Sequence, residues 1–288
     1  MTLLSLAHLT VMDAGPLELI DAAAAGGFDA VGLRIVPPMP TDVIVPVVGD
    51  RKMIREIERR LDATGVRLFD IEAVWLTPHT DVEALKPALA LGRQFGAASI
   101  LVIGNDPDMA RMEANLAKLC QLAHAEGLRV MLEPMSYVVL QNWQQAADVL
   151  VRVAQPNTGL LIDALHFYRA GGNPADLAKL DPALMPYFHL CDAYATAPPA
   201  EGLRPEGRGG RFYPGEGELR LGELLRAMPA EIPIAVEAPC ARYAGLSINE
   251  RARICGAATR ALLSGVFGPA SHQWRSAVPP PSSAIVVP

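Results

Sequence analysis

Residues 128–163 read LRVMLEPMSYVVLQNWQQAADVLVRVAQPNTGLLID, and this stretch decides the fold. It opens with a run of apolar, β-favouring residues at 128–133, passes through a loop into a helical pattern at 143–154, and closes on a second apolar run at 159–163. A strand, a helix and a second strand in this order form a right-handed crossover that joins two parallel strands. The stretch therefore predicts a parallel sheet with helices packed against it.

The same alternation of strand and helix recurs along the whole chain, in eight units. Gly65 and Gly127 directly follow two of the helical patterns, as helix C-caps require. The expected strands are 3–11, 30–36, 67–76, 99–103, 128–133, 159–163, 187–191 and 234–237. The expected helices are 16–27, 52–64, 82–95, 109–126, 143–154, 174–180, 221–228 and 248–263.

Eight such units fit either an open, doubly wound sheet or a closed barrel. No G-x-G-x-x-G motif follows the first strand, which removes the best sign of a dinucleotide-binding sheet. The length of 288 residues suits a single α/β barrel of about 250 residues. The prediction is an α/β protein with one (β/α)₈ TIM barrel over residues 1–265. Residues 266–288 are rich in proline and are expected to form a tail, or an arm onto a partner subunit.

The charge and composition exclude several classes of function. A formal net charge of −6 disfavours non-specific binding to nucleic acid or to an anionic membrane. No apolar run reaches the roughly 18 residues of a membrane-spanning helix, and no basic region precedes the first apolar run. The four cysteines are far apart and are expected to be free thiols. A cytoplasmic location is therefore expected.

Four consecutive strands end on a carboxylate or an imidazole, namely Glu133, Asp163, His189 and Glu237. In a (β/α)₈ barrel, chemistry takes place where strands end and loops begin, at the carboxyl face. Three carboxylates close together in a partly dry pocket repel one another unless a cation lies among them. The sequence therefore predicts a divalent metal. Oxygen ligands with one imidazole favour Mn²⁺, Mg²⁺ or Co²⁺, and they also suit Zn²⁺.

Five motifs mark these strand ends and the loops beyond them. They are Leu132-Glu133-Pro134, Asp163-x-x-His166, His189-Leu190-x-Asp192, Pro214-Gly215-Glu216-Gly217-Glu218 and Val236-Glu237. Together they resemble the sugar phosphate isomerase/epimerase superfamily, the xylose isomerase-like TIM barrels that include ketose epimerases and inosose dehydratases. The resemblance runs over residues 3–263. Its P-G-E-G-E loop and D-x-x-H motif are specific for the superfamily but for no substrate.

The resemblance implies roles for individual positions. The metal ligands would be Glu133, Asp163, His189 and Glu237. The two glutamates, Glu133 and Glu237, would also act as the acid/base pair that moves the proton. His166 would contact substrate oxygens. An arginine after the seventh strand would contact the substrate as well, and Arg208 and Arg211 are both candidates.

Several further residues carry weaker signals. His8, at the end of the first strand, is either a satisfied core histidine or a substrate-binding wall of the pocket. Arg34 and Glu72 are expected to pair with each other or to contact substrate. Asp192 is expected to orient a metal ligand from behind, and Trp75 to pack at the rim.

The predicted function is a metal-dependent sugar isomerase or epimerase of carbohydrate metabolism. It would act on a small sugar, sugar acid or keto-polyol through an enediolate, whose charge a Lewis-acidic metal stabilises. Carboxylates on opposite walls would remove the proton and return it elsewhere.

Alternatives remain open beside this prediction. A dehydratase or lyase of the inosose-dehydratase type needs the same first step, and a non-catalytic sugar-binding barrel needs none. An apurinic-site endonuclease is disfavoured by six histidines in all and a negative net charge. The expected partners are a small carbohydrate substrate and further copies of the chain, in a homodimer or homotetramer, with neither nucleic acid nor membrane.

Overall fold

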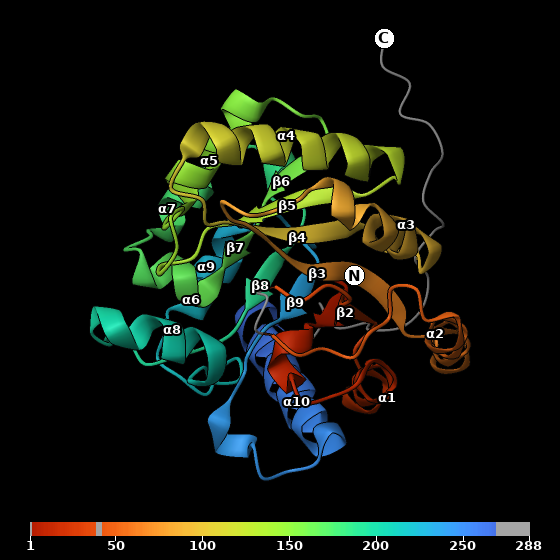
Figure 1. The fold of residues 1–288 in the computed structure, drawn as a ribbon. Coiled ribbons are helices and arrows are strands. Elements are labelled where there is room, and N and C mark those ends of the chain that lie inside the picture. The colour runs from red at the N-terminus through yellow and green to blue at the C-terminus, as the bar shows by residue number, and fades with distance from the viewer. Residues whose placement is uncertain (1, 39–41, 269–288) are drawn as a thin grey trace.

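The computed structural model describes residues 2–38 and 42–268. Nine parallel strands form one sheet in the order β6-β5-β4-β3-β2-β1-β9-β8-β7, curled into a nearly closed barrel (Figure 1). The strands are β1 (Leu4–Leu6), β2 (Ala30–Arg34), β3 (Arg67–Leu76), β4 (Ser99–Gly104), β5 (Arg129–Glu133), β6 (Thr158–Leu160), β7 (Ile162–Asp163), β8 (Phe188–Leu190) and β9 (Ile234–Val236).

Each strand position around the barrel is called a stave, and strands β6 and β7 together form one stave. Only Leu161 separates them, and its N–H donates to the carbonyl oxygen of Leu132 at 3.0 Å. β6 pairs with β5 and β7 pairs with β8, so the two ends of the sheet meet along this stave. The structure thus has eight staves, and the predicted (β/α)₈ barrel is confirmed.

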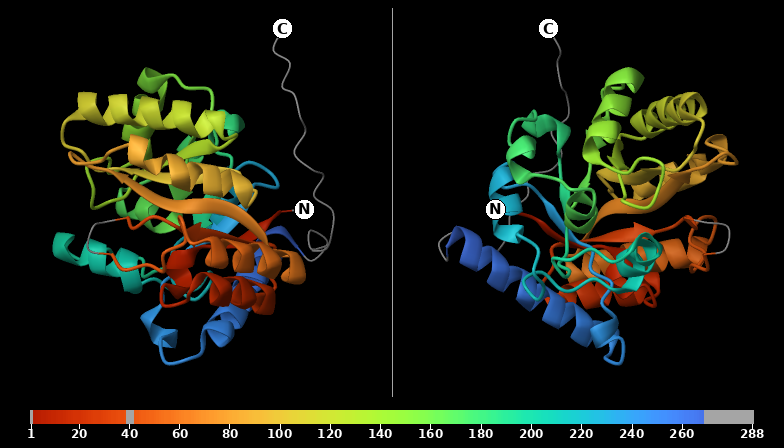
Figure 2. Two further views of the ribbon diagram at one scale, coloured as in Figure 1. Left: turned by 45° about the vertical axis from the view of Figure 1, so that its right-hand side comes forward. Right: turned by 90° about the vertical axis from the view of Figure 1, so that its left-hand side faces the viewer.

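Helices surround the barrel (Figures 1 and 2). They are α1 (Pro16–Gly26), α2 (Arg51–Thr64), α3 (Lys86–Gln94), α4 (Met109–Ala125), α5 (Trp143–Val153), α6 (Ala164–Arg169), α7 (Pro174–Leu177), α8 (Ala200–Gly209), α9 (Leu221–Ala227) and α10 (Ile248–Phe267). Helix α2 ends as predicted at Gly65, whose φ of 72° lies in the left-handed region that glycine adopts without strain. No helix in the described parts of the chain is long and apolar enough to cross a membrane.

The apolar core has two parts because side chains alternate across each strand. One part lies between the strands and the surrounding helices. The other part fills the inside of the barrel, and it consists of Ala73, Leu101, Ile103, Met131, Met135, Val138, Leu161, Tyr187 and Ala235. A packed interior leaves the carboxyl ends of the strands as the place where inward-facing polar side chains gather.

The first strand is shorter than predicted. β1 ends at Leu6, and His8–Val11 forms a 3₁₀ helix, η1. Thr10 explains this turn, because its hydroxyl donates to the carbonyl oxygen of Val236 at 2.8 Å and accepts from the N–H of Ala238 at 2.9 Å. These bonds hold the chain against the end of β9, where a continued strand could not reach them.

Two helices were not predicted. Helix α6 begins directly after Asp163, whose side chain accepts from the N–H of His166 at 3.0 Å and so caps the helix. Helix α8 lies in a segment predicted to be loop, since Pro205 and several glycines lower its helix propensity. At the other end of the chain, α10 runs to Phe267, slightly past the predicted barrel boundary at 265. The predicted tail falls almost wholly at 269–288, outside the described residues.

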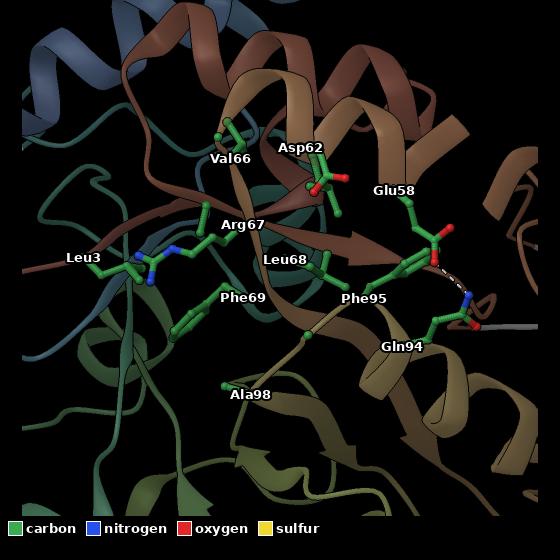
Figure 3. A pocket seen from close by; sticks show the side chains of 14 residues that line it. Leu3, Glu58, Asp62, Val66, Arg67, Leu68, Phe69, Gln94, Phe95 and Ala98 are labelled. Carbon is green, nitrogen blue, oxygen red and sulfur yellow. Dashed lines mark hydrogen bonds between the residues drawn. The ribbon is translucent and has the colours of Figure 1, made fainter. Parts of the chain in front are cut away.

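A hollow of about 910 Å³ opens at the amino end of the barrel (Figure 3). Leu3, Arg67, Phe69 and Phe95 are among the residues that line it, and they precede or begin strands or end a helix. None of the residues that line it is a predicted site residue. The predicted chemistry therefore belongs to the opposite end of the barrel.

Candidate metal centre

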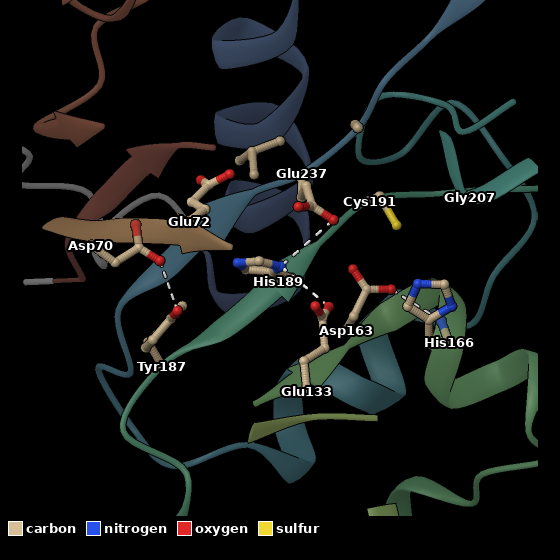
Figure 4. A network of polar contacts seen from close by, with 12 residues as sticks. Asp70, Glu72, Glu133, Asp163, His166, Tyr187, His189, Cys191, Gly207 and Glu237 are labelled. Atoms are coloured by element: carbon tan, nitrogen blue, oxygen red, sulfur yellow. Dashed lines mark hydrogen bonds and ion pairs between the residues drawn. The ribbon is translucent and has the colours of Figure 1, made fainter. Parts of the chain in front are cut away.

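Four neighbouring staves bring the predicted metal ligands together (Figure 4). Glu133 ends β5, Asp163 ends β7, His189 lies in β8, and Glu237 follows β9. Each is almost fully buried. One ligand atom from each residue lies within 4.8 Å of the corresponding atom of every other. The convergence predicted from strand ends more than a hundred positions apart is thus present in the structure.

Several ligand atoms of this cluster have no hydrogen-bond partner. They are Oε1 of Glu133 and both ring nitrogens of His189. Nδ1 of His189 lies 3.6 Å from Oε1 of Glu133 and 3.7 Å from Oε2 of Glu237, distances longer than a hydrogen bond. Buried polar atoms without partners are costly. A divalent cation would satisfy Oε1 of Glu133 and one ring nitrogen of His189, and three carboxylates with one imidazole are a donor set that fits such an ion.

Arg211, which follows the end of α8, lies against the cluster. Its Nη1 is 2.7 Å from Oδ2 of Asp163, and its Nη2 is 3.0 Å from Oε2 of Glu237. It also donates to the main-chain carbonyls of Gly207 and Glu237, at 2.9 and 2.8 Å. Only 1% of its side chain is exposed.

Arg208, the other predicted candidate, lies elsewhere. Its side chain is 34% exposed, and its Nη2 is 3.5 Å from Oδ1 of Asp42. Of the two arginines, the structure brings Arg211 to the cluster.

The two glutamates of the cluster differ in electrostatic environment. Burial raises the pKa of Glu133 to about 7, against the opposing influence of His189. Burial also opposes ionisation of Glu237, but the positive charges of Arg211 and His189 outweigh it and hold its pKa well below the usual range. For His189, burial is outweighed by the charges of Glu237 and Glu133, which raise its pKa well above 6.5. Without a cation, the cluster therefore retains protons that a metal would displace.

His166 lies beside Arg211, as its predicted place near the substrate requires. Its Nε2 is 3.4 Å from Nη2 of Arg211, and its Nδ1 is 3.3 Å from the hydroxyl of Ser136. The ring meets Tyr137 edge-on, with centroids 5.2 Å apart. Burial lowers the pKa of His166 to about 4, so the ring is neutral near pH 7.

His8 has a different environment, since main-chain groups use both of its ring nitrogens. Nε2 is 3.0 Å from the carbonyl oxygen of Ala14, and Nδ1 accepts from the N–H of Arg34 at 3.1 Å. Burial lowers its pKa to about 4. This is the satisfied core histidine of the two predicted alternatives, and the ring offers no free nitrogen to a substrate.

Asp192 does not orient a metal ligand, so that prediction is wrong. Its carboxylate instead accepts four main-chain N–H bonds at 2.9–3.1 Å, from Ala193, Gly215, Gly217 and Leu219. Gly215 and Gly217 belong to the P-G-E-G-E loop, and Leu219 directly follows it. The motif therefore marks a loop that is tied to the end of β8, and Asp192 is its anchor.

The sequence analysis missed Asp70, which lies inside the barrel below the cluster. Its Oδ2 accepts from the hydroxyl of Tyr187 at 2.7 Å (Figure 4). Burial raises the pKa of Asp70 to about 6. Gly32 leaves room for it, because a Cβ there would come within 2.5 Å of Oδ1 of Asp70 and 2.1 Å of Oε1 of Glu72. The signal was present in the sequence: two acidic residues stand two apart in a β-favouring run, and so face the same side.

A model of the xylose isomerase-like TIM barrel family matches residues 20–258. The chain belongs to this family. Among curated members, an inosose isomerase of Bacillus licheniformis is 27% identical over 157 residues, which cover 53% of this chain and 55% of that protein. A 3-dehydroshikimate dehydratase of Pseudomonas aeruginosa is 27% identical over 241 residues, which cover 77% of this chain and 35% of that protein. The chain thus spans about half or less of the length of the curated relatives it matches.

Solved structures of the family share the fold. The IOLI protein with a bound zinc atom superposes with a TM-score of 0.76 at 18% identity, over 93% of this chain and 99% of that one. A 3-keto-D-glucoside 4-epimerase of E. coli superposes with a TM-score of 0.68 at 15% identity, over 92% of this chain and all of that one. The sequence relatives of this chain therefore include isomerases and a dehydratase, and an epimerase shares its fold.

Proposed function

We propose that this protein is a divalent-metal-dependent isomerase or epimerase of a small polyhydroxylated carbonyl compound. The observation that carries the proposal is the buried cluster of three carboxylates and one imidazole, in which Oε1 of Glu133 and both nitrogens of His189 make no hydrogen bond. A set of buried, unpaired ligand atoms that face one another is costly without a cation and favourable with one. The family's curated activities are consistent with this chemistry.

The proposed ligands are Glu133, Asp163, His189 and Glu237. When bound, the ion would act as a Lewis acid that polarises the substrate carbonyl and makes the neighbouring C–H more acidic. Glu133 and Glu237 come from staves on either side of His189 and would exchange a proton with the substrate carbon through their carboxylate oxygens. The side chains of His166 and Arg211 are buried beside the cluster and would contact the substrate oxygens, in exchange for bonds that they make to each other and, for Arg211, to Asp163 and Glu237.

A second candidate is a dehydratase on the same site. The similarity to 3-dehydroshikimate dehydratase favours it, since that match covers 77% of this chain. Dehydration begins with the same proton removal and then expels a hydroxyl group as water. The two candidates therefore differ in product mass, not in the residues that they need.

The test uses full-length protein loaded in turn with Mn²⁺, Mg²⁺, Co²⁺ or Zn²⁺ in D₂O. The probes are an inosose, a panel of ketoses and 3-dehydroshikimate. We expect deuterium to enter at carbon without loss of water for an isomerase or epimerase, and a product lighter by one water for a dehydratase. Metal removal and Glu133→Gln should abolish both signals, whereas Glu126→Gln, a matched change on the protein surface, should not. A chain that retains none of the four ions after gel filtration would overturn the proposal.

A further inference from the structure

Arg34, at the carboxyl end of β2, and Glu72, within β3, form a buried pair that is distinct from the four metal ligands. The two residues are direct neighbours in the register between these strands. Arg34 lies on the same side of β2 as Gly32, whose missing Cβ faces Glu72, so its side chain points into the barrel. Only 5% of Arg34 and 1% of Glu72 is exposed.

The pair leaves polar atoms without partners. Nε and Nη1 of Arg34 and Oε2 of Glu72 have no hydrogen bond, and Nε and Oε2 are 3.6 Å apart. Two other groups of the pair bond to His8: Oε1 of Glu72 accepts from the N–H of His8, and the N–H of Arg34 donates to the ring of His8. The bonds to His8 thus hold the pair in place, while Nε and Nη1 of Arg34 and Oε2 of Glu72 make no hydrogen bond. Such an arrangement costs free energy unless a ligand completes it.

We infer that Arg34 and Glu72 form a second subsite for the substrate, which binds a hydroxyl group of an uncharged polyol away from the reacting carbonyl. A hydroxyl can accept from Nε or Nη1 of Arg34 and donate to Oε2 of Glu72 at the same time. A carboxylate can only accept, and Oε2 of Glu72 would repel it. The inference rests on the proposed function, because it names the class of substrate that this function takes.

The charge of the barrel interior supports an uncharged ligand. Five buried carboxyl groups converge there, namely Asp70, Glu72, Glu133, Asp163 and Glu237. Against them stand two buried arginines, Arg34 and Arg211, and the proposed divalent ion would add two positive charges. With all five carboxyls ionised and the ion bound, one negative charge would remain in excess. An anionic substrate would therefore find no net positive charge to attract it.

The position of the subsite determines which part of a substrate it would contact. In the order of the sheet, β2 lies across the barrel from β6 and β7, the latter of which carries Asp163. β3 lies across from β8, which carries His189. A cyclic or open-chain polyol held at the metal cluster by its carbonyl would direct a distant hydroxyl toward Arg34. The subsite would thus distinguish polyols from deoxy compounds and from keto acids.

The test measures binding without turnover. The probes are myo-inositol, an uncharged cyclic polyol that has no carbonyl, and shikimate, a cyclic polyol that carries a carboxylate. Each is titrated by calorimetry into Mn²⁺-loaded, full-length protein. We expect myo-inositol to bind more tightly than shikimate, and Arg34→Met or Glu72→Gln to weaken its binding at least tenfold. Arg67→Met, the same change at the amino end of β3, should leave the affinity unaltered.

Each outcome decides the question. No binding of myo-inositol, or equal binding by Arg34→Met and the unaltered protein, would overturn the inference. Tighter binding of shikimate that is lost in Arg34→Met would replace the polyol with an anion. Metal content confirms that each variant is folded, and Arg34→Lys serves if Arg34→Met is not. Deuterium exchange on the same samples separates the two proposals, because binding that depends on Arg34 without any exchange would refute only the proposed function.

Discussion

Replacing Arg211 by methionine removes the guanidinium that pairs with two carboxylates of the cluster while keeping a similar apolar length. The side chain is 1% exposed and lies 2.7 Å from Asp163 and 3.0 Å from Glu237. Loss of one partner from a buried ion pair costs about 3–5 kcal/mol, because the other charge stays buried and uncompensated. That is a large part of the roughly 5–15 kcal/mol that stabilises a typical domain.

The assay is urea unfolding of metal-free protein, followed by circular dichroism. We expect the free energy of unfolding to fall by about 3–5 kcal/mol in Arg211→Met. Arg242→Met is the matched control: its side chain is half exposed and pairs with Glu216 at 3.4 Å, so its loss should cost less than about 1 kcal/mol. Added Mn²⁺ should restore much of the loss in Arg211→Met, since the ion compensates the same carboxylates.

Two results would refute this reasoning. The first is an unfolding free energy of Arg211→Met within about 1 kcal/mol of the unaltered protein. The second is a loss of equal size in both arginine variants. Should Arg211→Met not fold without metal, Arg211→Lys keeps one positive charge and should show a smaller loss that Mn²⁺ also reduces.

Three further predictions concern stability. The pKa of His8 is about 4 in the fold and 6.5 in the unfolded chain, so the unfolded state binds more protons as the pH falls from 6.5 to 4. The free energy of unfolding should therefore drop by up to about 3 kcal/mol over that window. His8→Gln should remove this pH dependence in urea unfolding measured at several pH values. Asp192→Asn should cost about 3 kcal/mol and expose the P-G-E-G-E loop to hydrogen exchange, because an amide cannot accept all four N–H bonds; unchanged protection of Gly217 would contradict this. Gly32→Ala places a methyl group 2.1 Å from a carboxylate oxygen and should destabilise the fold by about 1–3 kcal/mol. Gly49→Ala is the comparison: Gly49 has open space around it and a φ of 87°, so this variant measures the effect of backbone strain alone.

The sequence predicted the cluster because each of its members ends or follows an apolar run. Glu133 and Asp163 stand where β-favouring residues give out, and a barrel places all such positions at one rim. Arg208 and Arg211 could not be separated in the same way, since both lie in a segment without strand periodicity. The deciding contacts are main-chain bonds to distant segments. The N–H of Arg211 donates to the carbonyl oxygen of Pro239 at 3.2 Å, and the next residue, Phe212, exchanges two main-chain hydrogen bonds with Asp192.

What the sequence did not reveal depends on contacts between distant segments. The turn of η1 requires Thr10 to meet Val236, and α8 forms despite Pro205. The role of Asp192 was misjudged because a carboxylate beside a metal ligand in sequence is expected to serve that ligand. Three of the four main-chain N–H groups that it binds instead lie 23 to 27 positions away. No local pattern contains that information.

All four members of the cluster come from β5 to β9, whereas the Arg34–Glu72 subsite comes from β2 and β3. Under the two proposals, the later half of the chain would supply the metal ligands together with His166 and Arg211, and the earlier half would supply the Arg34–Glu72 pair. A recombination point in the loop after β4 would exchange one without disturbing the other. Chimaeras that graft residues 2–104 of another family member onto this chain should therefore lose the preference that depends on Arg34 and Glu72 and keep the recipient's ion.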